Sequence, residues 1–151
     1  MTNAPAKSGG WPGRTGMSDA ILREIAQLLA SFLETGESGA IDLRGMPLTD
    51  FDRVELEARL GQGEVSAIIT VAGTSEIWET AISGVWWVRH RGEGDRIASE
   101  EIVVTRIPEI LATHVDDARD GLARLLTLLE NATMDSNDPQ SARPTEWQEE
   151  R

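Results

Sequence analysis

The first strong pattern in the chain is helical. Apolar residues recur at intervals of three and four between Ile21 and Leu33, which is the spacing of one face of an amphipathic α-helix. Ser18 is a good N-cap in front of this run. Thr35-Gly36 ends it, because glycine adopts the left-handed conformation of a helix C-terminus at little cost. The pattern predicts a helix from Ser18 to Thr35.

Two further helices are expected. Thr49 and Asp52 resemble a capping box and start a helix that runs to Leu60 and stops at Gly61. A final helix over about residues 115–129 has Asp116 and Asp117 at its N-terminus, where the helix dipole favours negative charge. We expect this helix to bury Leu122, Leu125, Leu126 and Leu129.

From Gly63 onward the apolar period changes to two, which is typical of strands. Strands are expected at 63–71, 76–82, 85–91 and 97–107, with a short additional strand at 40–43. The connections between the last four strands are short, so these strands should form an antiparallel meander. The amphipathic helices need a surface to cover. The predicted fold class is therefore α+β, an antiparallel sheet of four to five strands with two to three helices packed on one face.

The two ends of the chain have a different composition. Residues 1–17 are rich in Gly, Pro, Ser and Ala, and residues 132–151 are mostly polar. Such segments bury too little apolar surface to offset chain entropy, so we expect a disordered tail at each end. The folded body is expected to be a single domain over residues 18–131.

Composition and charge exclude several classes of function. Fourteen Lys and Arg against 26 Asp and Glu give a formal net charge of −12, which disfavours binding to nucleic acid. The sequence has no cysteine, which excludes disulfides, thiol catalysis and thiolate metal sites. No apolar run approaches the ~20 residues of a membrane span, and residues 1–17 lack the features of a secretory signal. A protein without membrane insertion is expected.

Candidate catalytic and metal-binding groups are few. The two histidines, His90 and His114, lie near no nucleophile motif, and no phosphate-binding loop is present. His114 and Asp117 would supply two metal ligands where a closed zinc site needs four, so no metal and no cofactor are expected. An enzyme that binds a small metabolite or a metal through carboxylates of the sheet, using Glu79 with His90 or Asp residues, stays open as an alternative.

Carboxylates of the sheet do not form an obvious pair. Glu76 and Glu79 are three apart in a strand, which places them on opposite faces. For Glu79, an ion pair with Arg89 on the next strand is the favoured interpretation. A second structural interpretation is that Glu79 and Thr80 fix the turn and bulge around Gly84.

Three tryptophans are more informative. Trp86 and Trp87 are consecutive in a strand, so one should pack under the helices while the other reaches the open face of the sheet. Trp78 can join the exposed indole, depending on register. Because tryptophan is enriched at binding hot spots, we expect a partner-binding surface there. The candidate partner-binding residues are Trp78, Trp86, Trp87, Glu64, Glu79 and Arg89. The alternative is that a second copy covers this face in a purely structural homodimer.

Three short motifs resemble a known family. They are Leu60-Gly61 with Gly63-Glu64-Val65, then Glu79-Thr80 with Gly84-Val85-Trp86, and finally Ile107-Pro108 with Ile110-Leu111. In this order and spacing they are similar to the HupH/HyaF family of [NiFe]-hydrogenase maturation proteins. Longer members resemble two such domains in tandem, so this chain is more similar to the short, single-domain HoxT-like members.

The resemblance implies a non-enzymatic assembly chaperone in the cytoplasm. Its client would be the immature hydrogenase small subunit, a precursor that carries iron–sulfur clusters. The chaperone would protect these clusters, notably against oxygen, before the large subunit docks. The resemblance also implies a second partner, a longer HupH/HoxQ-like paralogue. An acidic surface is suited to steering a basic segment of such a client.

Overall fold

The computed structural model describes residues 15–136, which form three α-helices and one sheet of five strands. The tails expected at the two ends fall largely outside these residues. The elements in chain order are α1 (Met17–Thr35), β1 (Gly39–Asp42), α2 (Asp50–Leu60), β2 (Ser66–Thr70), β3 (Thr74–Glu79), β4 (Val85–Arg91), β5 (Ile97–Val104) and α3 (Val115–Ser136).

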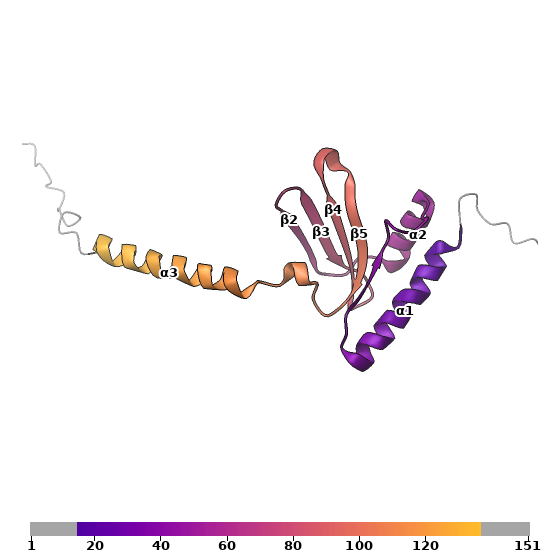
Figure 1. The fold of residues 1–151 in the computed structure, drawn as a ribbon, viewed down its shortest axis with the longest axis horizontal. Coiled ribbons are helices and arrows are strands. Elements are labelled where there is room, and N and C mark those ends of the chain that lie inside the picture. Colours follow the sequence, from indigo (N-terminus) through magenta and orange to yellow (C-terminus); the bar gives the residue numbers. More distant parts are fainter. Residues whose placement is uncertain (1–14, 137–151) are drawn as a thin grey trace, which may run out of the picture. The chain divides into compact units, whose positions relative to one another are not determined.

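All neighbouring strands of the sheet are antiparallel, in the order β1-β5-β4-β3-β2 (Figure 1). The meander expected for the last four strands is confirmed. The position of the first strand could not be predicted from sequence: β1 pairs with β5, with Ile41 opposite Ile102. The α+β fold class with an antiparallel sheet is confirmed.

Several strand limits differ from those expected. β2 begins at Ser66 rather than at residue 63, and β3 runs from Thr74 to Glu79 rather than over 76–82. The hydroxyl of Thr80 is the reason for the early end of β3, because it donates to the Ile82 carbonyl and accepts from the Ile82 N–H. These two bonds close a tight turn where a continuing strand was expected.

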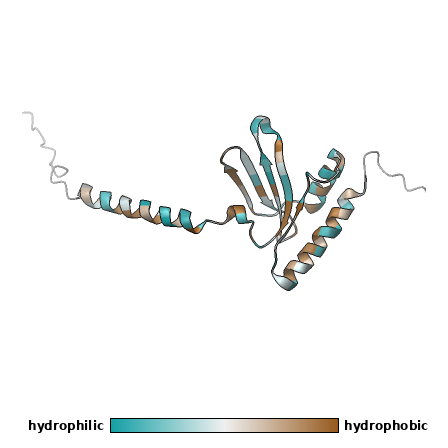
Figure 2. Cartoon of the chain, viewed as in Figure 1, coloured by the Kyte–Doolittle hydropathy of each residue, from teal (hydrophilic) through white to brown (hydrophobic). Residues whose placement is uncertain are grey.

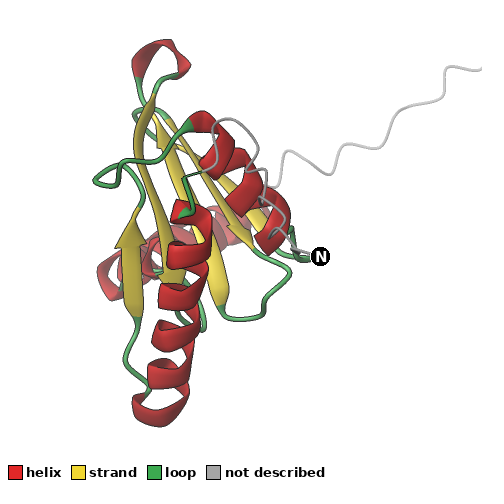
Figure 3. Cartoon of the chain, turned by 90° about the vertical axis from the view of Figure 1, so that its right-hand side faces the viewer, coloured by secondary structure: helices red, strands yellow, loops and turns green. Residues whose placement is uncertain are grey.

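The core lies between one face of the sheet and the pair α1 and α2. In Figure 3 these two helices lie in front of the strands. The alternation along β4 and β5 directs one set of side chains toward the helices. The buried cluster consists of Ile21, Ile25, Ile41, Leu43, Leu56, Leu60, Val85, Trp87, Ile102 and Val104.

The C-terminal end of α1 agrees with the sequence prediction, whereas its N-terminal end does not. Gly36 ends the helix in the left-handed conformation, with φ of 76°, as expected. Ser18 is not the N-cap, because the N-cap lies two residues earlier, at Gly16, and the helix begins at Met17. Ser18 is instead fully buried, and its hydroxyl donates to a Glu55 carboxylate oxygen at 2.5 Å. The residue expected to cap α1 therefore joins α1 to α2.

The capping box of α2 is confirmed. The Thr49 hydroxyl accepts from the Asp52 N–H at 3.1 Å, and the Asp52 carboxylate accepts from the Thr49 N–H at 3.1 Å. The same carboxylate accepts hydrogen bonds from the Thr49 and Thr15 hydroxyls at 2.7 and 2.8 Å. These donors, above all the Thr49 side chain, lower the pKa of Asp52 to about 2.

This lowered pKa predicts a pH dependence of stability. An aspartate whose pKa falls on folding stabilises the native state above its unfolded pKa of about 4, and this contribution is lost as the pH falls toward about 2. In Asp52→Asn, the unfolding free energy should therefore be lower than in the wild type near neutral pH, and the difference should shrink between about pH 4 and pH 2. Urea denaturation across this range measures it. A difference that stays constant with pH would contradict the prediction.

The structure separates after Ile110 into two units, so α3 is described by itself. It extends to Ser136, past the expected end at residue 129 and into the expected tail. Polar and apolar residues alternate along α3 (Figure 2). The helix by itself leaves Leu122, Leu125, Leu126 and Leu129 51–58% exposed, and their expected burial stays a prediction. A helix cannot bury its own apolar stripe. None of the helices in the described residues is long and apolar enough to span a bilayer.

Candidate functional site

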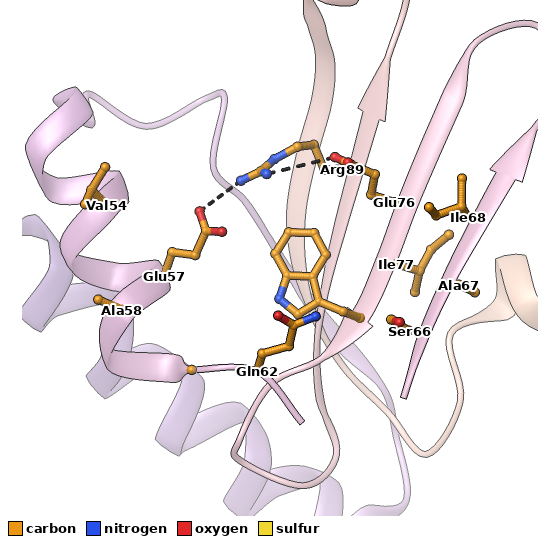
Figure 4. A pocket seen from close by; sticks show the side chains of 12 residues that line it. Val54, Glu57, Ala58, Gln62, Ser66, Ala67, Ile68, Glu76, Ile77 and Arg89 are labelled. Carbon is orange, nitrogen blue, oxygen red and sulfur yellow. Dashed lines mark hydrogen bonds and ion pairs between the residues drawn. The ribbon is translucent and has the colours of Figure 1, made fainter. Parts of the chain in front are cut away.

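The first unit contains a groove of about 620 Å³ between α2 and the strands β2 and β3. Figure 4 shows Val54, Glu57 and Ala58 entering it from the helix, and Ile68 and Glu76 from the strands. The lining residues are Val54, Glu57, Ala58, Gly61, Gln62, Ser66, Ala67, Ile68, Glu76, Ile77, Trp78 and Arg89. The groove lies on the helix side of the sheet and combines apolar walls with a few charged groups.

Trp78 supplies the aromatic surface of the groove. It is half-buried, and its ring stacks on the fully buried Trp87 with centroids 5.5 Å apart and planes at 9°. The β3–β4 register places the two residues directly opposite each other, and such cross-strand pairs share a face. The rigid core side chain thereby fixes the orientation of the indole that a ligand could contact.

Arg89 lies over both indoles. Its guanidinium carbon is 5.1 Å from the Trp78 ring centroid and 5.7 Å from that of Trp87, which is within the range of a cation–π interaction. Its nitrogens bind Glu100 at 2.7 Å and Glu57 at 3.1 Å, and one lies 4.0 Å from Glu76. This residue therefore connects α2, β3, β4 and β5 at the groove.

Glu100 is the carboxylate on which this arrangement depends, and it is not among the candidate residues predicted from the sequence. It is fully buried, accepts from the Trp87 indole N–H at 3.0 Å and pairs with both Arg89 and Arg53. A signal was available: Glu100 is two residues before Ile102 in a strand, so it shares the core-facing side with that residue. A charged residue at a core-facing position needs partners, and two arginines supply them.

Trp86 does not lie on an open surface, as the predicted binding site requires. It lies on the opposite face from Trp87, as the pleat requires, but it is only 4% exposed. Its indole N–H donates to the Thr105 carbonyl at 3.1 Å, so the segment after β5 satisfies it. The prediction that one of the two neighbouring indoles is exposed is wrong. Trp78 also joins Trp87 and not Trp86, because the register pairs it with Trp87.

The three charged candidates, Glu64, Glu79 and Arg89, do not lie together on one face of the sheet. Arg89 lies on the helix side, whereas Glu79 is opposite Trp86 on the other side, so the expected Glu79–Arg89 ion pair is wrong. Glu79 accepts instead from the Gly84 N–H at 3.1 Å, which confirms the structural interpretation of this residue. Glu64 is exposed in the segment before β2. Of the six candidates, the structure brings together Trp78, Trp87 and Arg89.

The two histidines have local partners. His90 Nδ1 is 2.6 Å from the Ser75 hydroxyl on the neighbouring strand, and His114 Nδ1 is 3.5 Å from Asp116 rather than near Asp117. Within residues 15–136, no group of three or more His, Asp or Glu side chains is arranged to hold a metal ion.

Two of the short family motifs, the one around Gly63 and the one that runs from Glu79 to Trp86, meet at one end of the groove. The Gly63 N–H donates to the Glu79 carbonyl at 2.7 Å, and the Ala81 N–H donates to the Leu60 carbonyl at 2.9 Å. A Cβ on Gly63 would lie 2.7 Å from the Thr80 carbonyl oxygen, so only glycine fits there. Gly84, with φ of 82°, turns the chain into β4. These motif residues hold the connection between α2 and β2 against the turn between β3 and β4.

Comparison with known proteins identifies a family and several relatives. A family model described as "HupH hydrogenase expression protein, C-terminal conserved region" matches residues 17–132. The chain is 28% identical over 128 residues to the hydrogenase expression/formation protein HoxQ of Azotobacter vinelandii, covering 80% of the chain and 45% of the relative. It is 29% identical over 111 residues to HupH of Rhodobacter capsulatus, covering 74% and 40%. The chain thus spans less than half the length of these curated relatives.

A solved structure matches the fold closely. The hydrogenase expression protein HupH from Thiobacillus denitrificans is 39% identical, with a TM-score of 0.76. The match covers 78% of this chain and 98% of that one.

Proposed function

The chain belongs to the family of HupH hydrogenase expression proteins, and from this membership we propose that it acts in hydrogenase maturation as an assembly chaperone. The relatives are named as expression or formation proteins, which supports a role in building the enzyme rather than in its reaction. The proposed activity is therefore binding of a client, not catalysis.

The proposed client is the iron–sulfur small-subunit precursor. The chaperone holds it in the cytoplasm and shields its clusters, notably from oxygen, until the large subunit docks. A longer HupH/HoxQ-like paralogue is proposed to take part in the same complex. The curated relatives HoxQ and HupH are examples of such longer proteins, since the matches cover 45% and 40% of their length.

The observation that supports a binding role best is the groove beside Trp78. Its walls carry apolar side chains that are well exposed, Val54 at 67% and Ile68 at 72%. Its aromatic surface is held rigid by the stack on Trp87. An apolar concave site with an oriented tryptophan and a few convergent polar groups is typical of binding sites.

Co-purification with a tagged small-subunit precursor tests this proposal. Val54→Asp places a charge on the groove wall and should reduce the recovered complex by about tenfold or more, because a buried unpaired charge is costly at an interface.

Leu33→Asp is the matched control. Leu33 is 77% exposed on α1 and does not line the groove, so this variant should retain the complex. Both variants should keep the wild-type melting temperature within a few degrees, because both sites are exposed. Equal recovery of both variants would contradict the placement of the client in the groove, and no recovery with the wild type would contradict the client itself.

A further inference from the structure

The outer edge of β2 is the feature next to the groove that needs explanation. β2 is the last strand in the sheet order, with β3 on one side only (Figure 1). The Glu79 N–H donates to the Val65 carbonyl, so Val65 belongs to the set that bonds to β3. In an antiparallel ladder this set alternates, and Ser66, Ile68 and Thr70 therefore direct their N–H and C=O groups outward.

This edge lacks the usual protection against pairing. Exposed edge strands are normally guarded by charged residues, proline or a bulge. The segment Ser66–Thr70 reads Ser-Ala-Ile-Ile-Thr and contains no charge and no proline. Ile68 is 72% exposed and the following Val71 is 78% exposed. The opposite edge strand, β1, has only four residues and ends in an exposed aspartate.

The same edge opens into the groove. Ser66 and Ile68 line the groove, since they share the helix-side face with their partners Trp78 and Glu76. A strand added to β2 would lie about 4.8 Å farther out and would repeat this alternation. Every second side chain of the added strand would then point to the side where Val54 and Ala58 of α2 lie.

The charge around the groove distinguishes two candidate binding partners of the β2 edge, a second copy of this chain and a basic segment of another protein. Of the charged residues that line the groove, Glu57 and Glu76 are negative and Arg89 is positive, which leaves one negative charge in excess. Glu64, just before β2, is exposed and adds another. The chain as a whole has a net charge of −12. A second copy would bring like charges together, whereas a basic segment would be attracted.

We infer that the free edge of β2 binds an extended, net-basic segment of a partner protein by strand addition, with apolar side chains at alternate positions entering the groove. This inference rests on the proposed binding function and adds the mode of recognition. Backbone hydrogen bonds to Ser66, Ile68 and Thr70 supply affinity, and the groove beside Trp78 supplies selectivity.

The test uses the isolated chain and a designed probe. The probe is a fluorescent peptide of about ten residues with alternating Val and Thr and two arginines at each end; a twin peptide carries glutamates in place of the arginines. Anisotropy should show the arginine peptide binding about tenfold or more tightly than its twin, with the difference shrinking at high salt. Amide NMR shifts on binding should be largest at Ser66, Ile68 and Thr70.

Ile68→Pro tests the edge itself. The Ile68 N–H points away from β3, so proline there removes an outward donor while the β2–β3 ladder remains. Binding should weaken about tenfold or more, while Ile68→Val should bind like the wild type. If the proline variant does not fold, Ile68→Lys places a repelling charge at the edge and should weaken binding similarly.

Three results would overturn the inference: peptide binding unchanged in Ile68→Pro or Ile68→Lys, equal binding of the two peptides, or no binding of the arginine peptide. Light scattering that shows a dimer abolished by Ile68→Pro would identify a second copy as the occupant and would also overturn it. The assay contains no hydrogenase component. Its failure is therefore separate from a failure to co-purify the small-subunit precursor.

Discussion

Glu100→Ala is expected to lower the free energy of unfolding by about 3–5 kcal/mol, because removing one partner of a buried ion pair leaves the other charges uncompensated. Two arginines and one indole N–H lose their acceptor at once in this variant. Since small domains are stable by only about 5–15 kcal/mol, the loss is a large fraction of the total. Urea denaturation followed by tryptophan fluorescence measures it.

Two further variants test whether the buried charge of Glu100 is the cause of this loss of stability. Glu100→Gln keeps an oxygen acceptor for the Trp87 indole and should be less destabilising than Glu100→Ala, because only the charge is lost. Glu101→Ala removes the next carboxylate on the same strand, which lies on the other face and is only partly buried. Its cost should stay below about 1 kcal/mol. Equal effects of Glu100→Ala and Glu101→Ala would show that the buried network contributes no stability of its own.

Trp86→Ala and Trp87→Ala are each expected to destabilise the protein by about 3–5 kcal/mol, as large-to-small changes in a packed core do. Trp87 loses its stack with Trp78 and its bond to Glu100, and Trp86 loses its bond to the Thr105 carbonyl. Thermal unfolding of both variants, compared with the exposed control Leu33→Ala, tests this expectation.

The Trp86 result discriminates between two roles of that residue. A partner anchor on an open face would cost little stability and much binding when removed, whereas a buried residue costs stability first. Trp86→Ala that unfolds like the wild type but fails to bind the client would restore the original hypothesis of an exposed indole. Loss of stability comparable with that of Trp87→Ala would show that Trp86 is a core residue, as its burial indicates.

Local patterns predicted the elements well where a short-range physical rule governs them. The limits of β4 agree with the sequence prediction, and so do the capping box of Thr49 and Asp52 and the left-handed end of α1 at Gly36. Each of these depends on side chains within about four residues along the chain. The error at the start of β2 arises where Gly63 bonds to Glu79 of another segment. The error at the end of β3 has a local cause, because the Thr80 hydroxyl bonds to Ile82 in the turn that follows.

The candidate site was predicted only in part, for a similar reason. That Trp86 and Trp87 face opposite ways follows from the pleat and needed no structure. Whether Trp86 is covered depends on the segment after β5, nineteen positions farther along at Thr105. The assignment of Arg89 to Glu100, Glu57 and Glu76 rather than to Glu79 depends on strand register, which alternation alone does not specify.

The amino-acid sequence by itself determined the α+β class, the antiparallel meander and the motifs that mark the family, since these rest on periodicity and on residue order. Only the tertiary structure decided that β1 pairs with β5, that Glu100 is buried between two arginines, and that Trp78 stacks on Trp87 beside a groove. These features join residues far apart in the chain, and which distant partners meet is decided by packing, which no local pattern records.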